Sequence, residues 1–60
     1  MFPKVILKAG KEKSIQRRHP WIFSGAVYGV SREINDGEMV DVVDSQNKHL
    51  GTGYFSDKGS

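Results

Sequence analysis

The chain has 60 residues and a net charge of +2, with 37% hydrophobic residues and no cysteine. This length allows only one small domain, which buries about 60% of its unfolded surface and so has marginal stability. Disulfides are excluded, and no apolar run approaches the ~20 residues of a membrane span, so we expect a cytoplasmic protein that contacts no membrane.

The first third of the chain predicts a strand followed by a short helix. Lys4 to Ala9 is apolar and β-branched at its centre, which places Val5 and Leu7 on one face of a strand. Lys11 to Arg18 contains mostly good helix formers, and Pro20 biases the residue before it away from helix. A helix of about two turns is therefore predicted there.

The rest of the chain predicts strands separated by turns. Pro20 to Gly25 is an apolar corner closed by a turn, and Ala26 to Ile34 is extended. Asn35 to Glu38 favours a hairpin turn into a strand from Met39 to Asp44, which carries apolar side chains on both faces. A second turn leads to the last strand, His49 to Ser56. A strand covered on both faces indicates a barrel or sandwich, so the fold class is mainly β with one short helix (α+β).

The charge is distributed unevenly along the chain. Residues 1–24 carry six Lys or Arg against one Glu, a net charge of +5, whereas residues 25–60 carry a net charge of −3. Cations stacked on a helix repel one another, and contact with phosphates would recover that cost. From charge alone, a solvated surface that keeps the domain soluble is an open alternative. The candidate phosphate contacts of a polyanion partner are Lys11, Lys13, Arg17, Arg18 and His19.

Aromatic, histidine and serine residues suggest structural roles rather than chemistry. Trp21 and Phe23 offer rings for stacking on bases, but a thin core needs large apolar groups, so the sequence favours both as core anchors. His19 is explained more simply as a cap at the helix end than as a phosphate contact. Neither histidine has partners at ligand spacing, and neither a nucleophile elbow nor a complete dinucleotide fingerprint is present. No metal, cofactor or catalytic residue is therefore predicted.

A long motif adds a family resemblance. The run KEKSIQRRHPWIFSGAV, from Lys11 to Val27, resembles the N-terminal PUA domain of bacterial S-adenosylmethionine-dependent methyltransferases that modify cytosine C5 of large-subunit ribosomal RNA. Two weaker matches follow in the expected order. Asp36 to Asp44 resembles the GxxVxVxD strand of PUA domains, and Gly51 to Tyr54 resembles their GxGxY strand. The resemblance covers about Lys8 to Ser56.

The resemblance implies a PUA-like pseudobarrel formed as one domain over residues 1–60, with RNA lying against the first helix and an adjacent late strand. It implies an RNA-binding targeting module whose partners are large-subunit ribosomal RNA and the parent protein's own methyltransferase domains. S-adenosylmethionine would be bound by the parent and not by this chain, which would transfer no methyl group.

Two further expectations follow from the resemblance. PUA domains usually run longer and end with a strand that closes the barrel, so we expect a pseudobarrel incomplete at its C-terminal strand. An open strand edge would allow a homo-oligomer. The alternative function is a docking module, whose basic face meets an acidic surface of its own methyltransferase domain or of a ribosomal protein.

Overall fold

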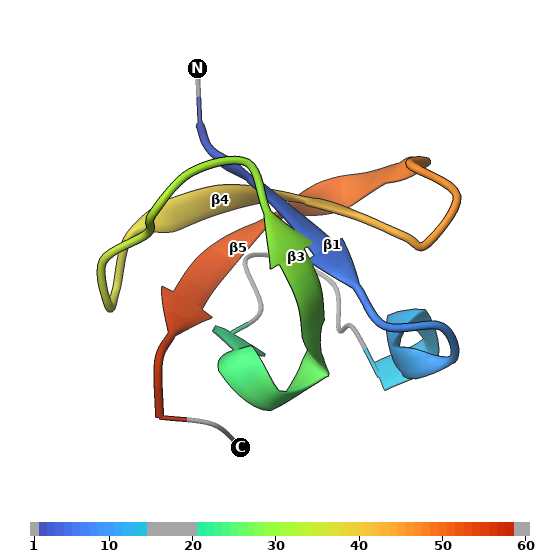
Figure 1. Cartoon of the computed structure of the whole chain (residues 1–60), viewed down its shortest axis with the longest axis horizontal. Coiled ribbons are helices and arrows are strands. Elements are labelled where there is room, and N and C mark those ends of the chain that lie inside the picture. Colours follow the sequence, from blue (N-terminus) through green and yellow to red (C-terminus); the bar gives the residue numbers. More distant parts are fainter. Residues whose placement is uncertain (1, 15–20, 59–60) are drawn as a thin grey trace.

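The computed structural model describes residues 2–14 and 21–58, and the side chains of residues 2–12 and 21–58. Within these ranges the chain forms five strands in one mixed sheet (Figure 1). The strands are β1 (Lys4–Leu7), β2 (Trp21–Phe23), β3 (Val27–Val30), β4 (Met39–Val43) and β5 (His49–Ser56), and the 3-10 turns are η1 (Lys11–Ser14) and η2 (Ser24–Ala26).

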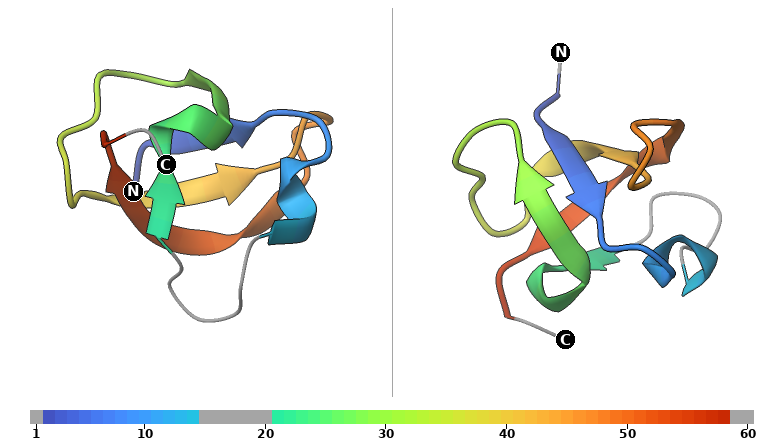
Figure 2. Two further views of the ribbon diagram at one scale, coloured as in Figure 1. Left: turned by 90° about the horizontal axis from the view of Figure 1, so that it is seen from below. Right: turned by 45° about the vertical axis from the view of Figure 1, so that its right-hand side comes forward.

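The sheet is strongly curved because its two edge strands are neighbours in the sequence. The order across the sheet is β2-β5-β4-β1-β3, yet only the three residues of η2 separate β2 from β3. Four Cα steps span at most about 14 Å. A flat sheet of five strands would separate its edges by about 19 Å. The sheet therefore curls until its edges approach each other (Figure 2), as expected for a mainly β, PUA-like pseudobarrel.

Two β-bulges add to this curvature. The register between β1 and β3 leaves Tyr28 as an extra residue on β3, and the register between β4 and β5 leaves Leu50 as an extra residue on β5. Bulges increase the local twist and redirect side chains. Gly51 follows the second bulge with a φ of 154°, a backbone conformation that residues with a Cβ rarely adopt. Both bulged side chains are exposed, Tyr28 to 79%.

Alternating side chains from four strands form the core inside the curved sheet. The clustered buried residues are Val5, Leu7, Ile22, Val40, Val42 and Phe55. The predicted inward face of β1 is thereby confirmed. Val43 is also buried and Met39 is half-buried, which confirms that β4 carries apolar groups on both faces. Each fully buried aliphatic side chain contributes about 1.5–3 kcal/mol, so this cluster supplies much of the driving force for folding.

The prediction that Trp21 and Phe23 are core anchors is wrong. On β2, Ile22 is only 1% exposed, whereas Trp21 is 56% and Phe23 is 39% exposed. Consecutive side chains on a strand point to opposite faces, so the central residue of this three-residue strand enters the core and its neighbours face outward. The sequence interpretation treated this segment as a corner, and therefore missed the alternation.

The predicted turn from Asn35 to Glu38 forms, but it does not make a hairpin. β3 pairs with β1, and β4 lies on the other side of β1, so residues 31–38 cross over between them. The Gly37 amide donates to the Phe55 carbonyl oxygen at 2.6 Å, and the Phe55 amide donates to the Glu38 carbonyl oxygen at 2.9 Å. The connection is therefore held against β5.

The structure differs from the sequence prediction at the expected helix and at the expected open strand edge. η1 covers the first four residues of the predicted helix, and residues 15–18 lie outside the described ranges; the described part contains no α-helix. It also contains no helix long and apolar enough to cross a membrane. The C-terminal strand β5 lies between β2 and β4, so the edges of the described sheet are β2 and β3.

Candidate nucleic-acid interface

The predicted RNA contacts begin at η1, directly after β1. Lys11 is exposed, and its backbone amide donates to the Lys8 carbonyl oxygen at 3.0 Å. Lys13 lies in η1, but its side chain is outside the described part. Arg17, Arg18 and His19 lie outside the described residues altogether. The structure thus places the start of the basic segment, and the role of all five residues stays a prediction.

A tight turn directs the chain from β1 into η1. Gly10 adopts a φ of 89°, the left-handed region that favours glycine. Its amide donates to Oε1 of Glu12 at 2.9 Å. The backbone of Lys8 is held next to Ala26, because the Lys8 amide donates to the Ala26 carbonyl oxygen at 2.9 Å, and the Lys8 side chain is exposed. The acidic side chain of this segment is therefore hydrogen-bonded to the backbone, and both Lys8 and Lys11 are exposed.

The turn between β4 and β5 lies on the same side of the molecule as η1 (Figures 1 and 2). Oδ1 of Asp44 accepts hydrogen bonds from the backbone amides of Gln46 at 2.9 Å and Lys48 at 2.8 Å. Asn47 adopts a φ of 68°, a conformation that asparagine tolerates better than most residues. The Asp44 carboxylate of this turn is therefore hydrogen-bonded to the backbone, and Lys48 is exposed.

The crossover loop and the end of β5 lie on the opposite side of the molecule from η1 (Figure 1), and several residues of these segments are acidic. They are Glu33, Asp36, Glu38 and Asp57. The Asp57 amide donates to Oδ1 of Asp36 at 3.0 Å, which joins the two segments. Within the described ranges, the lysines near η1 and the acidic residues of the crossover loop therefore lie on different sides of the folded chain, called the basic side and the acidic side below.

An ion pair stabilises the acidic side. Nη2 of Arg32 lies 2.5 Å from Oε2 of Glu38, and Oε1 of Glu38 accepts a hydrogen bond from the Asn35 amide at 3.1 Å. The hydrogen bond from Arg32, followed by that from Asn35, lowers the pKa of Glu38 below its ordinary value. Glu38 therefore stays ionised at neutral pH and braces the crossover loop.

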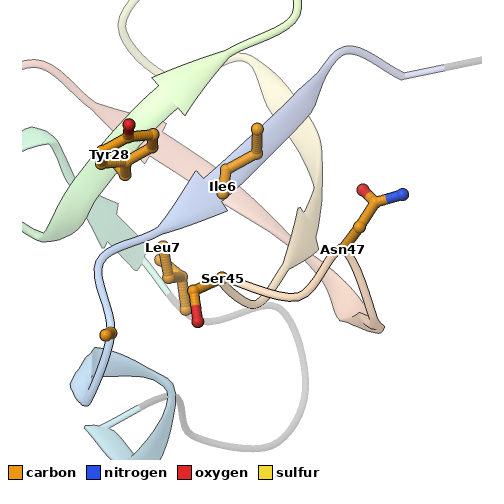
Figure 3. A pocket seen from close by; sticks show the side chains of 6 residues that line it. Ile6, Leu7, Tyr28, Ser45 and Asn47 are labelled. Atoms are coloured by element: carbon orange, nitrogen blue, oxygen red, sulfur yellow. The ribbon is translucent and has the colours of Figure 1, made fainter.

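A half-open pocket of about 470 Å³ lies on the basic side (Figure 3). It is lined mostly by apolar atoms, from Ile6, Leu7, Ala9, Tyr28, Ser45 and Asn47. Sequence reasoning missed this pocket, because the strands and the turn that line it are distant in the chain. The only local signal was Ile6, which the alternation of β1 places on the face away from Val5.

Aromatic rings form a second surface, with two exposed residues on β2 and the half-buried Tyr54 on β5. Trp21 and Tyr54 are register partners, and their ring centroids lie 5.6 Å apart with an interplanar angle of 42°. Phe23 is exposed on the same edge strand. Sequence reasoning had assigned Trp21 and Phe23 to the core, so this surface was not anticipated. Nothing in the described ranges brings together three or more His, Cys, Asp or Glu side chains that could hold a metal ion.

Comparison with known proteins establishes the family. Residues 5–60 match the family model of the PUA-like domain. The chain belongs to the PUA-like domain family. The predicted resemblance is confirmed at this level.

The relatives of this PUA-like domain are much longer proteins. It is 49% identical over 55 residues to ribosomal RNA large subunit methyltransferase I of Salmonella arizonae, and 48% identical over 56 residues to the protein of that name from Klebsiella pneumoniae. The Salmonella paratyphi C protein is 51% identical over 55 residues. These matches cover 92–93% of the chain but only 14% of each relative. The chain thus corresponds to a PUA-like portion of rRNA methyltransferases, and most of their length lies outside the match.

Proposed function

We propose that this PUA-like domain binds RNA and targets a methyltransferase to large-subunit ribosomal RNA. The observation that carries the proposal is the basic side of the fold. There the exposed Lys8, Lys11 and Lys48 lie on neighbouring segments, and the nearby carboxylates of Glu12 and Asp44 are engaged with backbone amides. Lysines whose neighbouring carboxylates are already hydrogen-bonded to backbone amides produce a positive potential that attracts a polyanion.

The proposed contacts are the five residues predicted from the sequence. Lys11 and Lys13 lie in η1, and Arg17, Arg18 and His19 follow them in the chain. Lysine and arginine neutralise phosphates and release condensed counterions, which makes the affinity depend on salt. With three or four phosphate contacts, log K should fall with log salt at a slope of about −2 to −3 for a single strand.

The finer features of the proposal come from the resemblance. The base modified would be a cytosine, at C5. The methyl group would come from S-adenosylmethionine bound in the remaining length of the parent, where catalysis would also take place. This chain would supply affinity and position in the cytoplasm, and no methyl transfer.

The experiment is a titration of fluorescently labelled single-stranded RNA at several salt concentrations, followed by anisotropy. The double variant Arg17→Ala/Arg18→Ala should bind more weakly and flatten the salt slope by about one unit or more. Its matched control is Lys4→Ala/Lys58→Ala, which removes two exposed positive charges outside the basic side. Unchanged slopes in the first variant, or equal losses in both, would reject the assigned contacts.

A second candidate function is docking onto the remaining part of a longer parent, and the surface formed by the exposed Trp21 and Phe23 with the half-buried Tyr54 favours it. A tryptophan that is 56% exposed beside a second aromatic ring is typical of interface anchors. Docking predicts that Trp21→Ser abolishes binding to the separately produced remainder of the parent and leaves RNA affinity unchanged. RNA binding through the basic side predicts that the Arg17/Arg18 double variant has the opposite pattern.

A further inference from the structure

The pocket on the basic side has the size and shape of a small-ligand site. Its volume of about 470 Å³ falls within the ~300–1,000 Å³ typical of ligand pockets. Ile6 and Tyr28 project from the adjacent strands β1 and β3, and Ser45 and Asn47 come from the β4–β5 turn (Figure 3). The pocket is half open, so it accepts a flat group that enters from solvent rather than an enclosed ligand.

The lining includes one aromatic ring and two polar side chains. Tyr28 is the extra residue of the β3 bulge, and 79% of its surface is exposed, so its ring is accessible for stacking. Tyr28, Ser45 and Asn47 have no side-chain hydrogen bond within the described ranges. A lining that includes an aromatic ring, an amide and a hydroxyl suits a nucleobase, which has a π face and an edge of donors and acceptors.

The charged residues next to the lining residues also favour a nucleotide as the ligand. Lys8 lies between the lining residues Leu7 and Ala9, and Lys48 directly follows the lining residue Asn47. Both lysines are exposed. The two segments that line the pocket thus each carry an exposed lysine next to a lining residue in the sequence, so a base in the pocket would have cations within its own segments for the adjoining phosphates. η1 begins only two residues after Ala9, so the pocket is continuous with the proposed RNA-binding segment.

We propose that this pocket holds one unpaired nucleobase of the bound RNA, stacked on Tyr28, with Lys8 and Lys48 on the flanking phosphates. The inference rests on the proposed RNA binding and assigns a base contact beyond the phosphate contacts of η1. RNA recognition outside helices commonly combines such stacking with a basic track along the backbone.

The test compares oligoadenylate with an abasic ribose-phosphate oligomer of equal length, both labelled, in anisotropy titrations of the 60-residue chain. The wild type should bind oligoadenylate more tightly. Tyr28→Ala should lose about five- to tenfold in affinity for oligoadenylate, the lower end of what a stacked base contributes, and nothing for the abasic oligomer. Tyr28→Phe, which retains the ring, should bind like the wild type.

Two further variants separate the pocket from general surface effects. Val30→Ala truncates an exposed residue on the same strand that does not line the pocket, so it should bind normally. Asn47→Gly removes the amide and keeps a backbone that tolerates the positive φ, so it should lose about two- to fivefold for oligoadenylate only. Thermal melting of each variant checks its folding, which Tyr28→Ala should retain because the side chain is exposed.

The outcomes distinguish the pocket from the function on which it rests. If the wild type binds both oligomers equally and Tyr28→Ala changes nothing, the chain binds RNA through phosphates alone and the pocket is refuted. If the wild type binds neither oligomer, the proposed RNA binding itself fails, and the pocket with it. If Tyr28→Ala weakens binding to the remainder of the parent and not to oligoadenylate, the pocket is a protein-docking site and the inference is overturned.

Discussion

Replacing a buried valine and an exposed valine with alanine, one at a time, tests whether the curved sheet encloses the core. Val40 on β4 is 0% exposed, whereas Val30 on the edge strand β3 is 43% exposed. Val40→Ala removes two buried methyl-sized groups, about 1.6 kcal/mol of transfer free energy at ~0.8 kcal/mol each. The residual cavity of a few tens of Å³ adds up to about 1 kcal/mol. The free energy of unfolding should therefore fall by about 2–3 kcal/mol.

Such a loss is large for this chain. At ~0.05–0.15 kcal/mol per residue, 60 residues have a free energy of unfolding of about 3–9 kcal/mol. One kcal/mol shifts Tm by about 4–8 °C in a domain of this size, so Val40→Ala should lower Tm by about 10–20 °C. Val30→Ala leaves no enclosed cavity and should cost about 0.5–1 kcal/mol.

The assay is thermal and urea unfolding followed by circular dichroism, with the two variants measured beside the wild type. Agreement between the two methods checks that unfolding is two-state. Equal destabilisation by Val40→Ala and Val30→Ala would refute the reasoning, because it would mean that β4 does not lie in the interior of a curved sheet.

Three further predictions follow from individual contacts. The single tryptophan, Trp21, should show red-shifted fluorescence and strong quenching by acrylamide, and a blue-shifted, protected emission would contradict its exposure. Because the folded-state pKa of Glu38 is lowered, its stabilising contribution is present above the ordinary value of 4.5 and is lost as the pH falls through the lowered pKa. Urea midpoints measured between about pH 6 and pH 3 should therefore fall less steeply in Arg32→Gln, and parallel pH curves would reject the ion pair. Asp44→Ala should cost about 1–2 kcal/mol by removing the acceptor of two backbone amides, whereas an alanine variant as stable as the wild type would show that this turn holds itself.

Local sequence patterns predicted the strands whose side chains alternate between the core and the outer face. The inward face of β1 and the bounds of β5 followed from apolar periodicity, because both strands have enough residues to express it. The three-residue strand β2 was missed, because a single alternation around Ile22 resembles any apolar corner. The order of the strands could not be predicted from local patterns. The turn at Gly37, for example, hydrogen-bonds to β5, which is distant in the sequence, and does not join β3 to β4 as a hairpin.

The candidate site was predictable only in part. The charges of Lys11 and its neighbours are visible in the sequence, and the family followed from a long motif. The pocket depends on the bulge that exposes Tyr28 and on the turn that carries Asn47, and their proximity is set by the parallel pairing of β1 with β4. Pairing between distant strands leaves no local signature, so this part of the site required the structure.

The short η2 link has a consequence for the order of folding. It makes residues 21–30 one continuous stretch that fastens to β5 at one sheet edge and to β1 at the other. β1 and β3 can pair early, but β2 has no partner until β5 is available. During synthesis, β2 therefore stays unpaired until β5 emerges. Contacts of such high sequence separation form slowly. The sheet edge that carries Trp21 thus forms only when β5 is in place.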